Sequence, residues 1–166
     1  MKIIYSDNSF YEGEMKNNKK NGQGYAEFPS GNIYQGEWKN NNVHGFGKVI
    51  YANKYGVYQG NWKNNKKHGY GKMVWTSTLY SKKHTYIGYW ENDKMCGKGK
   101  YIIEPQRYIY VGEFKNGVEH GYGILYANDY SFEGIWNNGH LGEKTVKYYR
   151  RSRRLMNKNH HSNTLK

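Results

Sequence analysis

The stretch YQGEWKNNNVHGFGKVIY, residues 34–51, decides the fold, because the chain repeats its pattern six times. Each copy opens on a similar motif: YEGEM at Tyr11, YQGEW at Tyr34, YQGNW at Tyr58, YIGYW at Tyr86, YVGEF at Tyr110 and FEGIW at Phe132. Self-similarity at a period of about 20–50 residues is typical of repeat architectures. Six copies of one unit build an extended surface, whereas an active site gathers unlike groups at one point.

Within the quoted copy, Tyr34, Gly36 and Trp38 alternate with polar residues, and a period of two predicts a strand with both rings on one face. The opposite face is expected to be wetter. Asn41 stands where the other copies have Asn, Asp or Gly, the residue types that best tolerate a left-handed turn. A Gly-x-Gly pair and a short apolar run, residues 49–51, follow as the second strand. The unit is therefore predicted to be a β-hairpin.

The composition favours an ordered but thin molecule. Apolar residues make up only 36% of the chain, yet aromatic residues make up 17% and stand in register. Aromatic rings bury a large area each, so they can hold together a structure without one large aliphatic core. The single cysteine, Cys96, excludes an internal disulfide framework. The chain has no apolar run long enough for a transmembrane helix, and MKIIYSDNSF lacks the apolar core of a secretory signal, so an intracellular, cytoplasmic protein is expected.

The two ends depart from the pattern. Residues 1–10 resemble the second half of a repeat and are interpreted as an N-terminal half-repeat cap. The array proper is assigned to residues 11–146, and its sixth copy has Glu143 and Thr145 where the others have glycine. Residues 77–85 form the longest insert between copies and are expected to be a loop. Irregular terminal repeats are typical of caps that cover exposed sheet edges.

The net charge of +13 is concentrated in the last part of the chain. Residues 144–166 hold eight of the 26 basic residues and no acidic residue. Residues 147–166 are assigned to a basic tail, for which we consider disorder, a nucleic-acid-binding arm, or a patch for anionic lipid. In the lipid hypothesis the contacts would be Lys147, Arg150, Arg151, Arg153 and Arg154. A lysine also follows the opening motif in four copies, which predicts either a charged ladder along one edge or ordinary solvated side chains.

Four consecutive copies carry His44, His68, Cys96 and His120 at the same place. A metal site would need its ligands about 2 Å from the ion. Each hairpin contributes two strands about 4.8 Å apart, so equivalent residues lie roughly 10 Å apart and cannot share one ion. We therefore predict a packing role beside the turn and no metal site.

The pattern Tyr-x-Gly-x-Trp, a turn residue and then Gly-x-Gly resembles the MORN repeat (membrane occupation and recognition nexus), from residue 11 to about residue 142. The resemblance implies an all-β fold: tandem β-hairpins forming one elongated, twisted antiparallel sheet with an aromatic-lined groove. It also implies a scaffold or adaptor, often at membranes or the cytoskeleton. Phospholipid binding is also attributed to the family. Met15 and Phe114 stand in the Trp place, and Phe132 in the Tyr place.

The function expected from these features is a non-catalytic scaffold that binds a protein partner, as a peptide or helix, along its aromatic groove. The predicted groove residues are Tyr34, Trp38, Tyr58, Trp62, Tyr86, Trp90, Tyr110 and Phe114. The alternative is a peripheral membrane protein that binds anionic phospholipid through its lysines and basic tail. Nucleic-acid binding is disfavoured, and open sheet ends allow a homodimer. Because the chain contains no nucleophile elbow, phosphate loop or paired-His motif, neither catalysis nor a cofactor is expected.

Overall fold

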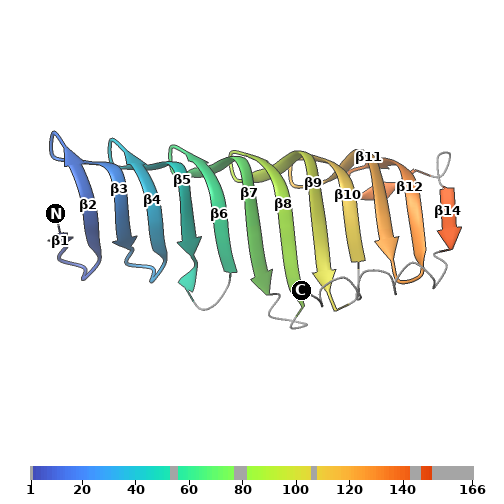
Figure 1. Cartoon of the computed structure of the whole chain (residues 1–166), viewed down its shortest axis with the longest axis horizontal. Coiled ribbons are helices and arrows are strands. Elements are labelled where there is room, and N and C mark those ends of the chain that lie inside the picture. Colours follow the sequence, from blue (N-terminus) through green and yellow to red (C-terminus); the bar gives the residue numbers. More distant parts are fainter. Residues whose placement is uncertain (1, 53–55, 77–81, 106–107, 143–146, 151–166) are drawn as a thin grey trace, which may run out of the picture.

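The structure is a computed structural model that describes residues 2–52, 56–76, 82–105, 108–142 and 147–150, with side chains up to residue 142. These residues form one open antiparallel sheet in which the strands follow one another in chain order (Figure 1). The strands are β1 (Lys2–Ile4), β2 (Phe10–Lys16), β3 (Lys19–Glu27), β4 (Ile33–Lys39), β5 (Asn42–Ile50), β6 (Gly56–Lys63), β7 (Lys66–Thr76), β8 (Lys83–Glu91), β9 (Lys94–Glu104), β10 (Tyr108–Lys115), β11 (Val118–Ala127), β12 (Tyr130–Asn137), β13 (His140–Leu141) and β14 (Lys147–Arg150). The predicted all-β architecture of tandem hairpins is confirmed.

Each hairpin closes through a two-residue turn in which both residues are left-handed. In the β4–β5 hairpin these are Asn40, with φ of 49°, and Asn41, with φ of 69°. Two consecutive left-handed residues form a type I′ turn, whose twist matches that of the flanking strands. The sequence pointed only to the second residue of each turn, which is confirmed. The tight turns line one long edge of the sheet, and the longer connections line the other (Figure 1).

The Gly-x-Gly pair lies inside the second strand, which begins directly after the turn. Pairing runs from Gly36↔Gly47 to Trp38↔Val43, so β5 carries extra residues opposite β4. Gly45 takes the left-handed conformation that this bulge requires, with φ of 60°. The sequence had placed the second strand at the apolar run alone. That boundary was wrong because Gly45 lies in a bulge within the strand and Gly47 pairs regularly with Gly36, so neither glycine belongs to a loop before the strand.

A row of paired glycines crosses the sheet beneath the opening tyrosines. Gly36 faces Gly47, and Gly47 in turn faces Gly60 on the next hairpin. The ring of Tyr34 lies so close that a Cβ added to Gly47 would meet the tyrosine oxygen at 2.2 Å. The missing side chains therefore make the space in which each tyrosine ring lies flat against the backbone.

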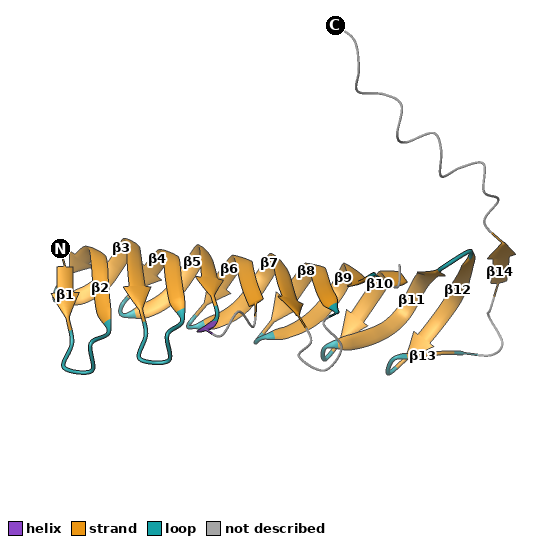
Figure 2. Ribbon diagram, turned by 90° about the horizontal axis from the view of Figure 1, so that it is seen from below, coloured by secondary structure: helices purple, strands orange, loops and turns teal. Residues whose placement is uncertain are grey.

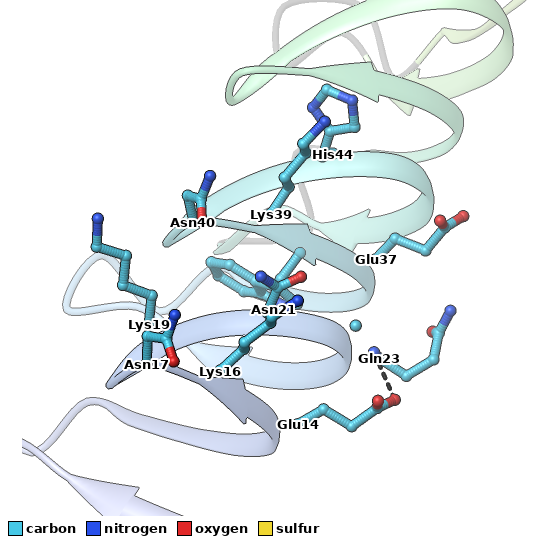
Figure 3. Close-up of a pocket in the computed structure, with 12 residues that line it drawn as sticks. Glu14, Lys16, Asn17, Lys19, Asn21, Gln23, Glu37, Lys39, Asn40 and His44 are labelled. Atoms are coloured by element: carbon cyan, nitrogen blue, oxygen red, sulfur yellow. Dashed lines mark hydrogen bonds between the residues drawn. The ribbon is translucent and has the colours of Figure 1, made fainter.

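We call the face that carries these rings the inner face, and the opposite side of the sheet the outer face. The ribbon curls around the inner face, and Glu14, Gln23 and Glu37 point away from it on the outer side (Figure 3). On that side Glu14 accepts a hydrogen bond from the backbone N–H of Gln23 at 2.8 Å. Residues of one strand therefore divide strictly between two faces, as the alternation in sequence predicts.

The two ends and the long insert differ from the regular units. β1 pairs with β2 as the second strand of a repeat would, in agreement with the half-repeat interpretation. The first residues assigned to the tail form β14, which pairs with β12 beyond the two-residue β13 (Figure 2). Residues 83–85, expected in a loop, belong to β8, because Trp75 and His84 extend the β7–β8 pairing. Residues 77–81 and 151–166 lie outside the described residues.

Candidate functional site

Rings from neighbouring repeats contact one another edge-to-face along the whole inner face. The ring of Trp62 lies 5.0 Å from Tyr58 in its own repeat and 5.7 Å from Tyr34 in the preceding one, at nearly right angles to both. The same alternation gives a chain in the order Tyr11, Trp38, Tyr34, Trp62, Tyr58, Trp90, Tyr86, Phe114, Tyr110 and Trp136. Such pairs contribute about 0.5–1.5 kcal/mol each beyond burial, so this row of ring contacts holds each repeat against the next.

All eight predicted groove residues lie in this aromatic chain, and the structure buries them. Tyr58 has no exposed surface, and Trp62 and Trp90 are only 9% and 6% exposed. The hydroxyl of Tyr58 donates to the Asn61 carbonyl at 2.9 Å, and the Trp90 indole N–H donates to the Gly71 carbonyl at 3.3 Å. These rings therefore hold the sheet together, and mainly the tryptophan edges remain for contact with another molecule.

An open hollow of about 400 Å³ lies on the inner face in the middle of the array. Its lining includes Tyr51, Lys67, Trp75, Trp90 and Met95. Apart from Trp90, none of these was predicted as a groove residue. Tyr51 and Trp75 stand 17 residues after Tyr34 and Tyr58, and Phe28 stands 17 residues after Tyr11, so an aromatic column in register was the signal.

One wall of the hollow continues into a stack of three rings. Trp75 is parallel to His84, with ring centroids 5.4 Å apart, and also stacks on Tyr101 at 5.9 Å. The Nδ1 atom of His84 lies 2.7 Å from the Tyr101 hydroxyl. Burial, with a smaller effect of Lys82, lowers the pKa of His84 below its ordinary value. The stack fixes the orientation of Trp75 at the rim of the hollow.

Lysines lie over the aromatic rings at two places on the inner face. The ammonium group of Lys67 lies 4.8 Å from the Trp90 ring centre, and that of Lys20 lies 4.8 Å from Trp38. These are cation–π distances. Burial lowers the pKa of Lys67, and the nearby Asp93 carboxylate opposes that shift. The hollow therefore combines aromatic walls with the partly desolvated charge of Lys67 and with the exposed side chains of Asp93 and Lys94.

The lysines that follow the opening motifs lie at the turn edge of the sheet. Cross-strand pairs Lys16↔Lys19 and Lys63↔Lys66 flank their turns. Between the first two hairpins, Lys16, Lys19 and Lys39 border an open hollow of about 720 Å³ (Figure 3). Of the predicted lipid contacts, Lys147 and Arg150 belong to β14, for which only the backbone is described. Arg151, Arg153 and Arg154 lie outside the described residues.

The His and Cys row is distributed one residue to a hairpin. Within residues 2–142, excluding the undescribed segments, no group of three His, Cys, Asp or Glu side chains is placed to hold a metal ion. The Nδ1 atoms of His44 and His120 are buried, and the described residues supply neither with a hydrogen-bond partner. Burial, with a smaller effect of Glu91, raises the pKa of the Cys96 thiol. In the described part of the chain, no helix is long and apolar enough to span a membrane.

A single sheet of near-identical β-hairpins, joined by ring contacts between neighbours, defines an open β-repeat protein. The chain belongs to the MORN repeat family, which matches residues 11–33, 34–54, 58–78, 86–104 and 110–131. No curated protein matches the chain. The sixth copy begins just beyond the last match, and its β12 and β13 form a hairpin with the same left-handed turn, at Asn138 and Gly139. The family is typically non-enzymatic.

Proposed function

We propose that the protein is a non-catalytic scaffold that binds a partner protein, as a peptide or helix, on its inner face. The observation that carries this is the hollow bordered by Tyr51, Trp75 and Met95, which exposes apolar side chains beside the charged groups of Lys67, Asp93 and Lys94. Aromatic side chains and Met are enriched at the centre of protein–protein contacts, and Trp and Tyr are among the residues that carry most of the binding energy. The buried tyrosines give the surface its rigidity, and the half-buried rim residues make the contact.

Site-specific photo-crosslinking in the native cell tests this proposal. A photoreactive phenylalanine analogue at position 51 is expected to capture one defined protein, and the same analogue at position 46, on the outer face, is the matched control. The charge reversal Lys67→Glu is expected to abolish capture at position 51 while the protein stays folded by circular dichroism. Equal capture at both positions, or capture that survives Lys67→Glu, would contradict an inner-face site.

A second candidate function is binding to anionic phospholipid, and the lysines along the turn edge favour it. Lys16, Lys19, Lys39, Lys63 and Lys66 are all exposed there. Each basic residue close to an anionic membrane contributes about 1 kcal/mol, and the attraction falls with salt. Flotation with phosphatidylserine vesicles at low salt is the test, with Lys39→Glu/Lys63→Glu against Lys48→Glu/Lys72→Glu on the outer face. Removal of residues 151–166 shows whether the tail contributes in addition to the turn-edge lysines. Flotation that is unchanged in both double variants and in the truncated protein would exclude lipid binding through either the turn edge or the tail.

A further inference from the structure

The outer face changes character along the array. In its first half the outward positions of the opening strands are polar, as at Gln35 and Gln59. In its second half Ile87, Tyr89 and Val111 take these positions, and Tyr89 and Val111 are 51% and 42% exposed. The second strands carry exposed rings in both halves, since Phe46 in β5 and Tyr70 in β7 are each 52% exposed, but Phe46 is opposite Asn61 whereas Tyr70 is opposite the ring of Tyr89. Contiguous apolar surface on a soluble protein marks an interaction site more often than scattered apolar residues do.

The strand register arranges these residues as two walls of a shallow trench, which we call the outer trench. One wall follows the pairings Ile87↔Lys100, Lys100↔Val111 and Val111↔Ile124 across β8–β11. The other wall includes Tyr70 and Tyr89, which are directly opposite each other with ring centroids 5.4 Å apart. The glycine row forms the floor, since Gly99 and Gly112 line a hollow of about 620 Å³ between the walls.

The trench has the length of a short helix. Five strands, β7 to β11, span about 19 Å at a spacing of about 4.8 Å. An α-helix of about 13 residues covers that length at 1.5 Å per residue. All five strands are paired on both sides, so an extended peptide would find no free backbone edge to join. A helix satisfies its own backbone groups and needs only an apolar stripe to match the trench.

The charged residues beside the outer trench indicate the charge of the partner that it would bind. Lys72, Lys98 and Lys100 are exposed on this face, and Lys72 and Lys100 stand on either side of Ile87 in the pairing. Two acidic residues oppose them: Glu113, opposite Lys98, and Glu133 at the β12 end, which accepts a hydrogen bond from the Tyr122 hydroxyl, so the lysines remain in excess. A second copy of the chain would bring the same lysine excess against itself, which disfavours self-association here. Carboxylates along the flanks of an apolar helix would meet the lysines.

We propose that the outer trench binds an amphipathic helix of a partner protein that has an apolar stripe flanked by acidic residues. This surface lies on the opposite side of the sheet from the inner hollow, so the two sites can be occupied together. A protein with both sites would bridge two partners through a rigid single-layer sheet.

The probe is a fluorescein-labelled, helix-stapled peptide of about 14 residues with leucines on one stripe and glutamates on both flanks, titrated into the full chain. A peptide with lysines in place of the glutamates is its charge control. Lys100→Glu is expected to weaken binding of the acidic peptide about tenfold or more. Lys48→Glu, the equivalent lysine two repeats earlier and outside the trench, is expected to change it less than about twofold. Val111→Glu, at an exposed position, is expected to abolish binding without unfolding the protein.

Failure of the acidic peptide to bind, or an equal loss with Lys48→Glu and Lys100→Glu, would overturn the proposal. A single-stranded RNA oligonucleotide, phosphatidylserine vesicles and sedimentation of the chain alone test the other occupants. The proposal would also be overturned if RNA or vesicles bind in a Lys100-dependent way, or if the chain self-associates in a way that Val111→Glu abolishes, and the acidic peptide does not compete with that binding. Because none of these variants touches the inner hollow, crosslinking from position 51 should be unaffected, and the two proposals succeed or fail separately.

Discussion

The inner and outer faces of the sheet are built from the same strands but follow different rules. On the inner face the same residue types recur in nearly every copy, and five opening tyrosines are at most 1% exposed. On the outer face the corresponding positions vary from Gln59 to Ile87 to Val111, and several large rings are half exposed. Because a repeat must match its neighbours on the inner face, that face specifies shape. The outer face is free to differ from copy to copy, so it is where one array can become distinct from another.

Alkaline pH should give the largest difference between the two faces, because it destabilises the folded state through all the buried tyrosines of the inner face at once. Burial raises the pKa of Tyr34, Tyr58, Tyr86 and Tyr110 well above the ordinary value of 10.0. The folded state then holds these protons more tightly than the unfolded chain. The resulting stability is complete below about pH 10 and is lost above it, by about 1.4 kcal/mol per pH unit for each tyrosine. Denaturant unfolding followed by circular dichroism from about pH 9 to 12 measures the slope.

Tyr58→Phe provides the control for that slope. The variant loses the hydroxyl bond to the Asn61 carbonyl, so it starts from a lower stability at neutral pH. Above about pH 10 its free energy of unfolding should fall less steeply with pH than that of the parent, and the difference in slope should be the contribution of one tyrosine, about 1.4 kcal/mol per pH unit. An unfolding free energy that stays constant from about pH 10 to 11.5 would contradict the role assigned to the buried hydroxyls.

Two adjacent residues, one on each face, allow the contribution of the faces to stability to be compared within one strand. Trp90→Ala should destabilise the protein by about 3–5 kcal/mol, since it removes the rings between Tyr58 and Tyr86 and leaves a cavity. Tyr89→Ala, one residue earlier and 51% exposed, should cost less than about 1 kcal/mol. Chemical denaturation of both variants gives the two values. Similar losses would show that the outer face also holds the fold together.

The sequence predicted the hairpin, its left-handed turn and the face on which the aromatics lie, because each depends on local periodicity and residue type. It also favoured rings that fill the sheet's own face. It did not predict how completely the tyrosines are buried, since that follows from each ring lying on a glycine pair contributed by two strands. The rim of the hollow was also missed, although Tyr51 and Trp75 stand in register. The outward positions of the opening strands were expected to be mostly polar, which holds at Gln35 and Gln59 but not at Ile87 and Tyr89. A pattern read from most of the copies does not apply to the individual copies whose residues differ.

The turn residues offer the smallest and most local test. Asn65 was interpreted as a residue that tolerates the left-handed conformation, but its side chain also accepts a hydrogen bond from the Val43 N–H at 2.7 Å, joining two repeats. Its backbone N–H donates to the Val43 carbonyl at 3.0 Å. Asn65→Gly keeps the turn and the backbone bond but loses two side-chain bonds, the one accepted from the Val43 N–H and the exposed one donated to the Asn42 side chain. Stability should fall by about 0.5–1.5 kcal/mol, mostly from the part-buried bond to Val43.

Gly117 is the matched site for the opposite change, since it occupies the same turn position and its N–H donates to the Met95 carbonyl at 2.9 Å. A Cβ there would meet no other atom within 4 Å, and asparagine tolerates its φ region. Gly117→Asn should therefore gain a bond to the Met95 N–H and raise the unfolding free energy by up to about 0.5–1.5 kcal/mol. Combining both changes should return the unfolding free energy close to that of the parent. Equal stability of the parent and Asn65→Gly would show that the ring contacts and backbone bonds alone join the repeats, and that the turn edge is as free to vary as the outer face.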